Sequence, residues 1–158
     1  MAEEARDHRK FLKQAKLWLE PGDDLPDVEY SNARNAINLY ATIRSCLFVV
    51  FVDTECEPCG DALNALYSIL SGRDWPVAIL VATDNHKKFE ALQDAFGGMA
   101  DVYWCPRRDM KNYYGTDATP WGYGVNEAGQ VVTSTVCGSR AEWRGLVRPF
   151  RKLVGDAG

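Results

Sequence analysis

Two cysteines, Cys56 and Cys59, stand with two residues between them in the segment Cys56-Glu57-Pro58-Cys59. The segment follows an apolar run, residues 45–52, and precedes a stretch whose apolar residues recur at helical spacing. At the start of a helix, backbone N–H groups point outward and the helix dipole favours a thiolate over a thiol. A cysteine pair with this spacing can close a small disulfide ring and open it again, so the pattern predicts dithiol–disulfide exchange.

The two sulfurs are expected to have different roles. Cys56 lies at the helix N-terminus and should be the exposed, attacking sulfur, whereas Cys59 lies one turn inside and should resolve a mixed disulfide. The alternatives for the pair are a structural disulfide or half of a zinc site. Zinc usually needs a second ligand pair, and the sequence has no second CxxC and no HxxxH. The histidines, His8 and His86, do not suggest a metal site either, and we expect no metal or other cofactor.

Acidic residues crowd the same segment: Asp53, Glu55 and Glu57 all lie within three residues of Cys56. A nearby negative charge disfavours a thiolate and would oppose the helix dipole. If this charge is felt at the sulfur, the pair is a reductant or a slow, partner-specific exchanger rather than a strong oxidant. The alternative is that these residues are three solvated loop carboxylates with little effect.

The elements that must position these residues follow from hydrophobic spacing and turn residues. Those expected ahead of the cysteines are a helix at residues 4–19, two hairpin strands at 25–30 and 36–40, and a buried strand at 45–52. Those expected after them are a helix at 59–70, a strand at 76–82, a helix capped by Asp84 and ending near 96, a short strand at 101–105, a helical turn at 109–114, a hairpin at 121–125 and 130–136, and a helix at 140–153 capped by Ser139. This order predicts an α/β fold with a mixed sheet and helices on both of its faces.

The combination of motifs resembles the TlpA-like branch of the thioredoxin superfamily. The resemblance rests on the opening segment 22–28, on the Cys-Glu-Pro-Cys motif, and on the stretch 119–131 that begins with Thr119-Pro120. The tail at 138–143 looks more like the MauD proteins of methylamine utilisation. The resemblance implies a thioredoxin-like fold, a central mixed β-sheet flanked by helices, with an N-terminal β-hairpin extension. We accordingly expect an N-terminal helical extension at residues 1–20 and a thioredoxin-like domain at 21–158.

The resemblance also implies a substrate-binding loop. It places a cis Thr119–Pro120 bond opposite the cysteines, where the backbone of Thr119 would meet an extended substrate segment. Trp121 would flank the same groove, as could Tyr123 and Trp104, although burial in the core is the commoner fate of such aromatic residues.

Three positions depart from the pattern of thioredoxins. Glu55 replaces the Trp that precedes the first cysteine, Val50 replaces a buried acid, and Val52 replaces an aromatic residue. We therefore expect a thiol–disulfide oxidoreductase that reduces the disulfide of a specific protein partner. One alternative is a peroxiredoxin-like peroxidase, although Thr54 is one residue too close to Cys56 for the Thr-x-x-Cys spacing of those enzymes. Another is a non-catalytic thioredoxin-fold binding or assembly module.

Composition and charge bear on the number of domains, the class of partner and the compartment. The chain has 158 residues, 46% hydrophobic and 25% charged, which suits one globular domain. The net charge of −4 gives no reason to expect a nucleic-acid partner, and no stretch approaches the ~20 apolar residues of a membrane span. Residues 1–16 are charged and show no signal peptide, which fits a cytoplasmic protein; an extracytoplasmic domain that has lost an N-terminal anchor would fit equally.

The other three of the five cysteines are expected to be packed thiols. Cys46 opens the buried strand at the end away from the site, and Cys137 follows the last hairpin strand. Cys105 ends a strand that should point towards the site, so an accessory thiol is the alternative there. The sequence does not indicate an oligomeric state.

Overall fold

The computed structural model of the chain describes residues 19–31, 36–116 and 118–155. The helix expected at residues 4–19, and with it most of the N-terminal extension, lies outside the described residues. The main sheet has the strand order β5-β4-β3-β6-β7. Its strands are β3 (Cys46–Asp53), β4 (Val77–Ala82), β5 (Asp101–Trp104), β6 (Trp121–Asn126) and β7 (Val131–Val136).

Strand β3 lies at the centre of the sheet and is nearly all apolar because both of its faces are covered. It pairs with β4 in parallel and with β6 in antiparallel orientation, and β5 extends the parallel part. Alternate side chains of β3 enter two separate hydrophobic clusters. Phe48 and Val50 belong to the cluster on one face, and Val49 and Phe51 belong to the cluster on the other.

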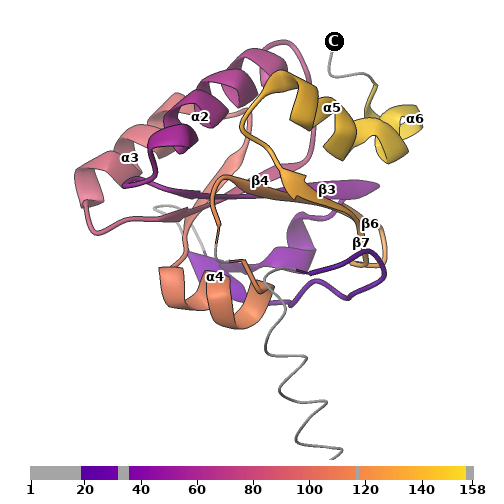
Figure 1. The fold of residues 1–158 in the computed structure, drawn as a ribbon, viewed down its shortest axis with the longest axis horizontal. Coiled ribbons are helices and arrows are strands. Elements are labelled where there is room, and N and C mark those ends of the chain that lie inside the picture. Colours follow the sequence, from indigo (N-terminus) through magenta and orange to yellow (C-terminus); the bar gives the residue numbers. More distant parts are fainter. Residues whose placement is uncertain (1–18, 32–35, 117, 156–158) are drawn as a thin grey trace, which may run out of the picture.

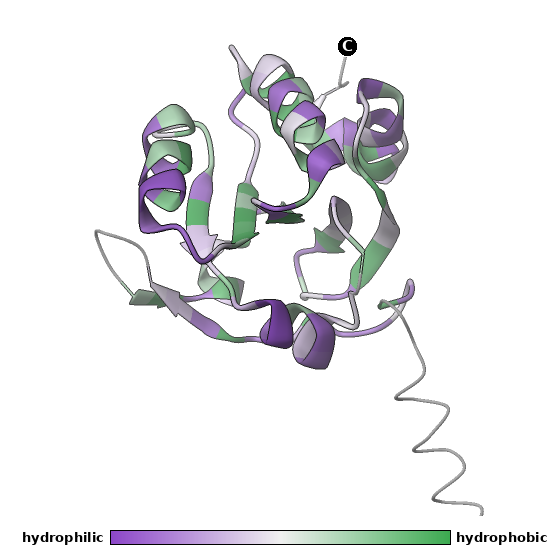
Figure 2. Cartoon of the chain, turned by 60° about the vertical axis from the view of Figure 1, so that its left-hand side comes forward, coloured by the Kyte–Doolittle hydropathy of each residue, from purple (hydrophilic) through white to green (hydrophobic). Residues whose placement is uncertain are grey.

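Helices cover both faces, as the sequence predicts (Figure 1). The helices α2 (Glu57–Leu70), α3 (His86–Ala95) and α5 (Arg140–Val147) lie on one side of the sheet. The helix α4 (Arg107–Tyr114) lies on the other side, together with the first hairpin. Figure 2 shows the apolar strands enclosed between these layers, with hydrophilic residues on the outward faces of the helices.

The expected N-terminal hairpin is present but shorter than predicted. Strands β1 (Glu29–Ser31) and β2 (Ala36–Asn38) pair in antiparallel orientation, and a 3₁₀ turn, η1 (Leu39–Thr42), follows. The described chain ahead of β1 does not pair with β2 but contacts the turn between β6 and β7, where the N–H of Leu25 donates to the carbonyl of Gly129 at 2.8 Å. The hairpin packs on the sheet through Tyr30, which is buried.

Several helix ends differ from the prediction. Asn85, not Asp84, caps α3, because the Asn85 side chain accepts the N–H of Lys88 at 3.1 Å. Helix α4 begins at Arg107, two residues before the turn predicted at 109–114. Ser139 caps α5 as predicted.

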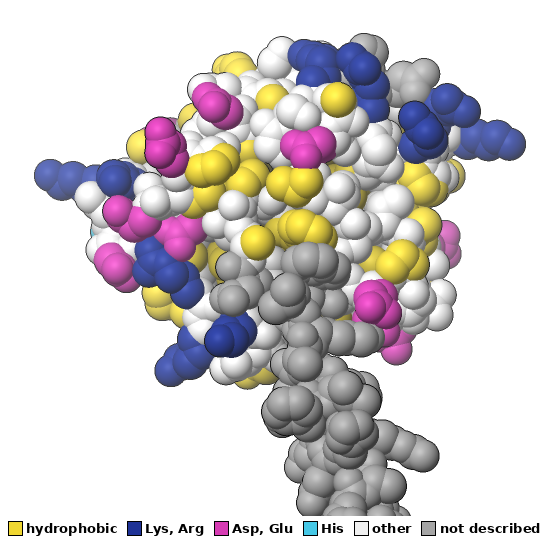
Figure 3. Space-filling model, in the orientation of Figure 1, with side chains coloured by type: hydrophobic (Ala, Val, Ile, Leu, Met, Phe, Trp, Pro, Cys, Tyr) yellow, Lys and Arg dark blue, Asp and Glu magenta, His cyan; other side chains and the backbone are white. Residues whose placement is uncertain are grey.

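The last helix is interrupted rather than continuous. After α5 the chain forms a 3₁₀ turn, η2 (Arg148–Phe150), and a final short helix, α6 (Arg151–Val154). Pro149 lies within this turn and has no N–H to donate to the preceding helical turn. Basic side chains gather over α5 and α6 at the upper right of Figure 3, and most of them are exposed, as expected of a solvated face. In the part of the chain that is described, no helix is both long and apolar enough to cross a membrane.

Candidate active site

The cysteine pair lies where the sequence predicts, between the end of β3 and the start of α2. Cys56 is the N-cap of α2 with extended backbone, and a disulfide joins it to Cys59. Pro58 lies in the first helical turn, where a missing N–H costs little. Cys56 is partly exposed and Cys59 is buried, with 2% of its surface accessible. This asymmetry fits the predicted roles of attacking and resolving sulfur.

Cys56 and Cys59 line a shallow cleft of about 340 Å³ between α2 and α3. Leu63 of α2 and Leu92 of α3 contribute apolar surface to it, and Lys88 contributes a positive charge. The cleft therefore gives a partner molecule access to the disulfide from one side.

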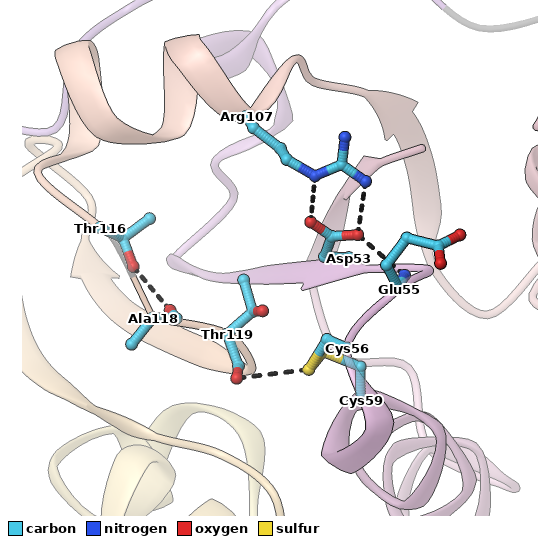
Figure 4. Close-up of a disulfide and its surroundings, with 8 residues drawn as sticks. All are labelled: Asp53, Glu55, Cys56, Cys59, Arg107, Thr116, Ala118 and Thr119. Carbon is cyan, nitrogen blue, oxygen red and sulfur yellow. Dashed lines mark hydrogen bonds and ion pairs between the residues drawn. A yellow bond between two sulfur atoms is a disulfide. The ribbon is translucent and has the colours of Figure 1, made fainter. Parts of the chain in front are cut away.

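The loop that the resemblance places opposite the cysteines is found there. The Thr119–Pro120 bond is cis, and the carbonyl oxygen of Thr119 lies 3.4 Å from the Sγ of Cys56 (Figure 4). In the dithiol form this carbonyl can accept a hydrogen bond from the Cys56 thiol. The two segments meet because β3 and β6 pair in antiparallel orientation, with Phe51 opposite Trp121.

The aromatic residues proposed for the groove have different environments. Trp121 is partly buried and its indole N–H donates to Ser134 at 3.1 Å. Tyr123 is fully buried and is a core residue. Trp104 is 49% exposed, but its indole N–H donates to the carbonyl of Thr83 beside α3, and it lines a separate hollow. Trp121 is thus the one of these three that lies next to the Thr119–Pro120 loop.

Helix α4 supports this loop from the far side of the sheet. The Tyr123 hydroxyl donates to the carbonyl of Tyr114, the last residue of α4, at 2.8 Å. Gly115 then ends the helix in the left-handed conformation, and the Thr116 hydroxyl donates to the carbonyl of Ala118 at 2.9 Å (Figure 4). These bonds tie Tyr114 and Ala118, which precede Thr119, to the buried residues Tyr123 and Thr116.

Two of the acidic residues beside Cys56, Asp53 and Glu55, have cationic neighbours. Arg107 makes two hydrogen bonds to the carboxylate of Asp53, and the backbone N–H of Glu55 donates to the same carboxylate at 2.9 Å (Figure 4). The Arg107 bonds, supported by the Glu55 N–H, hold the pKa of Asp53 below its usual value. The carboxylate of Glu55 lies 3.8 Å from the ammonium of Lys88, and Glu57 occupies the first turn of α2.

Sequence reasoning missed Arg107, Lys88 and Thr83 as neighbours of the site. The hydroxyls of Thr54 and Thr83 hydrogen-bond at 2.7 Å, so the loop after β3 is tied to the loop after β4. A usable signal did exist, because the carboxyl ends of parallel strands meet at one sheet edge. Asp53 ends β3, and Thr83 and Arg107 follow the parallel strands β4 and β5 at the same edge.

The other cysteines are packed thiols. Cys46, Cys105 and Cys137 are fully buried, and burial raises the pKa of each. The pKa of Cys105 rises to about 12, and its sulfur lies 3.7 Å from the buried hydroxyl of Tyr30. These surroundings fit the expected packing role and not that of an accessory thiol.

Comparisons with known proteins address the fold. A thio-disulfide isomerase from Thermus thermophilus superposes with a TM-score of 0.66 at 19% identity, over 87% of this chain and 99% of that one. The thioredoxin domain of a thiol-disulfide oxidoreductase from Bacteroides vulgatus has a TM-score of 0.66 at 15% identity, over 84% and 98% of the two chains. A thiol:disulfide interchange protein from a Bacteroides species has a TM-score of 0.66 at 15% identity, over 88% and 93%.

No protein-family profile and no curated relative matches the sequence. The TM-scores of 0.66 show a shared fold, and at identities of 15% to 19% the likeness shows the fold alone. The chain therefore has the thioredoxin-like fold with an N-terminal hairpin, as predicted.

Proposed function

We propose that this protein is a thiol–disulfide oxidoreductase that exchanges disulfides with a protein partner. The observation that carries the proposal is the arrangement of the disulfide. A partly exposed Cys56 at a helix N-terminus is joined to a buried Cys59, and the Thr119 carbonyl lies 3.4 Å from the outer sulfur. Several proteins of the same fold are described as thiol-disulfide oxidoreductases or interchange proteins, which supports this assignment.

The reaction transfers two electrons from a dithiol to a disulfide. In the reducing direction, the Cys56 thiolate attacks one sulfur of the partner's disulfide and forms a mixed disulfide, and the partner's other sulfur leaves as a thiolate that takes up a proton. The Cys59 thiol then loses its proton and attacks the Sγ of Cys56. This attack breaks the mixed disulfide, releases the second partner thiol and forms the Cys56–Cys59 bond. The partner gains two electrons and this protein loses them.

The surroundings of Cys56 favour a specific partner. Glu55 and Glu57 are exposed on either side of it and lie at the rim of the site. Like charges across an interface suppress wrong partners, so these carboxylates restrict which surfaces can approach the sulfur. The backbone of Thr119 and the side chain of Trp121 would contact the segment that carries the partner's disulfide. We propose the reducing direction for this exchange.

The compartment is a separate proposal. One protein of the same fold, from Streptococcus pneumoniae, is described as an exposed lipoprotein thioredoxin, and it shares 17% identity with this chain. This likeness supports the extracytoplasmic alternative for the present protein.

Trapping of the mixed disulfide tests the function. The Cys59→Ser variant can form the mixed disulfide but cannot resolve it, so it should accumulate a covalent, reductant-sensitive adduct with its partner. Cys56→Ser is the matched control, because it keeps the inner cysteine and removes the attacking one. Equal trapping by both variants, or none by Cys59→Ser when reduced protein is mixed with partner disulfides, would contradict the proposal.

A further inference from the structure

The loop that carries Cys56 is organised around one carboxylate. Asp53 ends β3 three residues before Cys56, and its side chain is only 15% exposed. Its carboxylate accepts the N–H of Glu55 at 2.9 Å, and its backbone carbonyl accepts the N–H of Cys56 at 3.0 Å. The position of the outer sulfur therefore depends on the position of Asp53.

Arg107 fixes that carboxylate from a distant part of the chain. Its Nε and Nη2 donate to the two carboxylate oxygens of Asp53, with Nη2 at 2.8 Å (Figure 4). Two parallel bonds of this kind give both strength and a fixed orientation. Arg107 is the first residue of α4, which is anchored by the buried side chains of Met110 and Tyr114. The guanidinium is therefore presented from an anchored element.

The pair also contributes to the charge near the sulfur. Without Arg107, the Asp53 carboxylate would be an uncompensated negative charge beside the thiolate that must form on Cys56. The other charged groups near this edge are Glu55 with Lys88 of α3, Glu57 of α2, and Asp84, which lies 3.5 Å from Arg107. Among these pairs, Asp53–Arg107 is the least exposed and has the shortest contacts, so solvent and salt screen it least.

We propose that Arg107 is a positioning residue for the redox centre: its ion pair with Asp53 holds the loop that carries Cys56 and cancels the negative charge beside that sulfur. The purpose of this role, which is disulfide exchange, rests on the proposed function. The effect on Cys56 itself is a property of the reduced protein and needs no partner.

The test compares variants that break the same ion pair with opposite changes of charge. Arg107→Gln leaves the Asp53 carboxylate uncompensated, whereas Asp53→Asn leaves the guanidinium uncompensated. Each reduced full-length protein is treated with iodoacetamide from pH 5 to pH 10, and labelling of Cys56 is followed by peptide mass analysis. We expect Arg107→Gln to slow labelling at pH 7 about threefold and Asp53→Asn to accelerate it about threefold, with the pH midpoints displaced in opposite directions.

Arg108→Gln is the matched control. Arg108 is the next residue of the same helix, is 79% exposed, and pairs with Asp109 of its own helix at 3.9 Å. Its removal changes the net charge equally and should leave labelling of Cys56 unchanged. Near-ultraviolet circular dichroism of each variant verifies that it is folded. Arg107→Lys keeps the positive charge but loses the two-nitrogen fork of the guanidinium, so its rate of Cys56 labelling should fall between those of wild type and Arg107→Gln.

Each outcome decides the matter. Displacements in opposite directions support the proposal. Displacements of the two variants in the same direction would mean that the pair acts on loop structure alone, and this would overturn the charge role. Equal profiles for Arg107→Gln, Arg108→Gln and wild type would overturn the proposal entirely. Failure of the Cys59→Ser variant to trap a partner would instead refute the proposed function and leave the result on Arg107 intact.

Discussion

Selective alkylation provides a quantitative test of the site. When the Cys56–Cys59 disulfide is reduced, the protein has five thiols, three of which are fully buried in the structure. Iodoacetamide reacts with thiolates, so the order of labelling reports both thiolate fraction and access. We predict that Cys56 reacts first and that Cys105 reacts at least about a hundredfold more slowly.

The magnitude follows from the pKa of Cys105, which burial raises to about 12. At pH 7 a thiol of this pKa is thiolate in about one molecule in 10⁵, whereas a free thiol of ordinary pKa, about 8.5, is about 3% thiolate. The ratio is about 3,000. Thiolates of higher pKa are intrinsically more nucleophilic, with a Brønsted coefficient of about 0.45, which returns a factor of about 40. A difference of about a hundredfold remains before the burial of Cys105 is counted.

The assay uses the protein reduced with a phosphine, iodoacetamide at pH 7, and acid quenching at intervals from seconds to hours. Digestion and mass spectrometry then give a rate for each cysteine peptide. Cys56→Ser is the control, and its early labelling should be lost while slow labelling of the buried thiols persists. Labelling of Cys46, Cys105 or Cys137 within tenfold of the rate at Cys56 would refute the assignment of Cys56 as the exposed, reactive sulfur.

Two further predictions concern stability. The pKa of Asp53 is lowered in the folded protein, so its carboxylate stabilises the fold above the unfolded pKa of about 3.9, and this contribution is lost as the pH falls further. In urea unfolding, the advantage of wild type over Asp53→Asn should therefore shrink between pH 7 and pH 3, and a constant difference would exclude this contribution. Gly124→Ala should cost about 2 kcal/mol of unfolding free energy, because its Cβ would lie 2.3 Å from the Thr133 Oγ1 and 2.5 Å from the ring of Phe150. Gly145→Ala should be neutral or stabilising, because its Cβ would have no atom within 4 Å apart from its chain neighbours and the backbone of its own helix. Equal stability of the two variants would contradict this packing.

The sequence predicts the parts of the fold that depend on local patterns. The apolar run of β3 and the helical spacing of α2 place the cysteine pair at their junction, and the structure confirms both elements. The Thr119–Pro120 loop could be placed opposite Cys56 only through the family resemblance, because the residues alone show no more than an X-Pro ahead of a strand. The structure bears out that placement.

Long-range polar contacts could not be predicted in the same way. Arg107 and Arg108 are adjacent and chemically identical, yet only Arg107 reaches Asp53, 54 residues away in sequence. Which of the two reaches the carboxylate depends on the angle at which α4 leaves β5, and no hydrophobic period encodes that angle. The cap of α3 shows the same limit, because Asp84 and Asn85 are both good capping residues and the exit of the chain from β4 selects Asn85.

Helix α4 explains how the two halves of the site keep their separation. Pairing of β3 with β6 brings Cys56 and Thr119 to the same edge, but both residues lie in loops beyond the last paired positions. At its start, α4 holds the loop of Cys56 through Arg107; at its end, the Tyr114 carbonyl is bonded to Tyr123 of β6, the strand that follows Thr119. One eight-residue helix thus contacts the last residue of β3 and a residue of β6, the strands that adjoin the two loops. The 3.4 Å approach of the Thr119 carbonyl to the sulfur is therefore a property of the β3–β6 pairing and of α4 together, and not of the Cys-Glu-Pro-Cys segment alone.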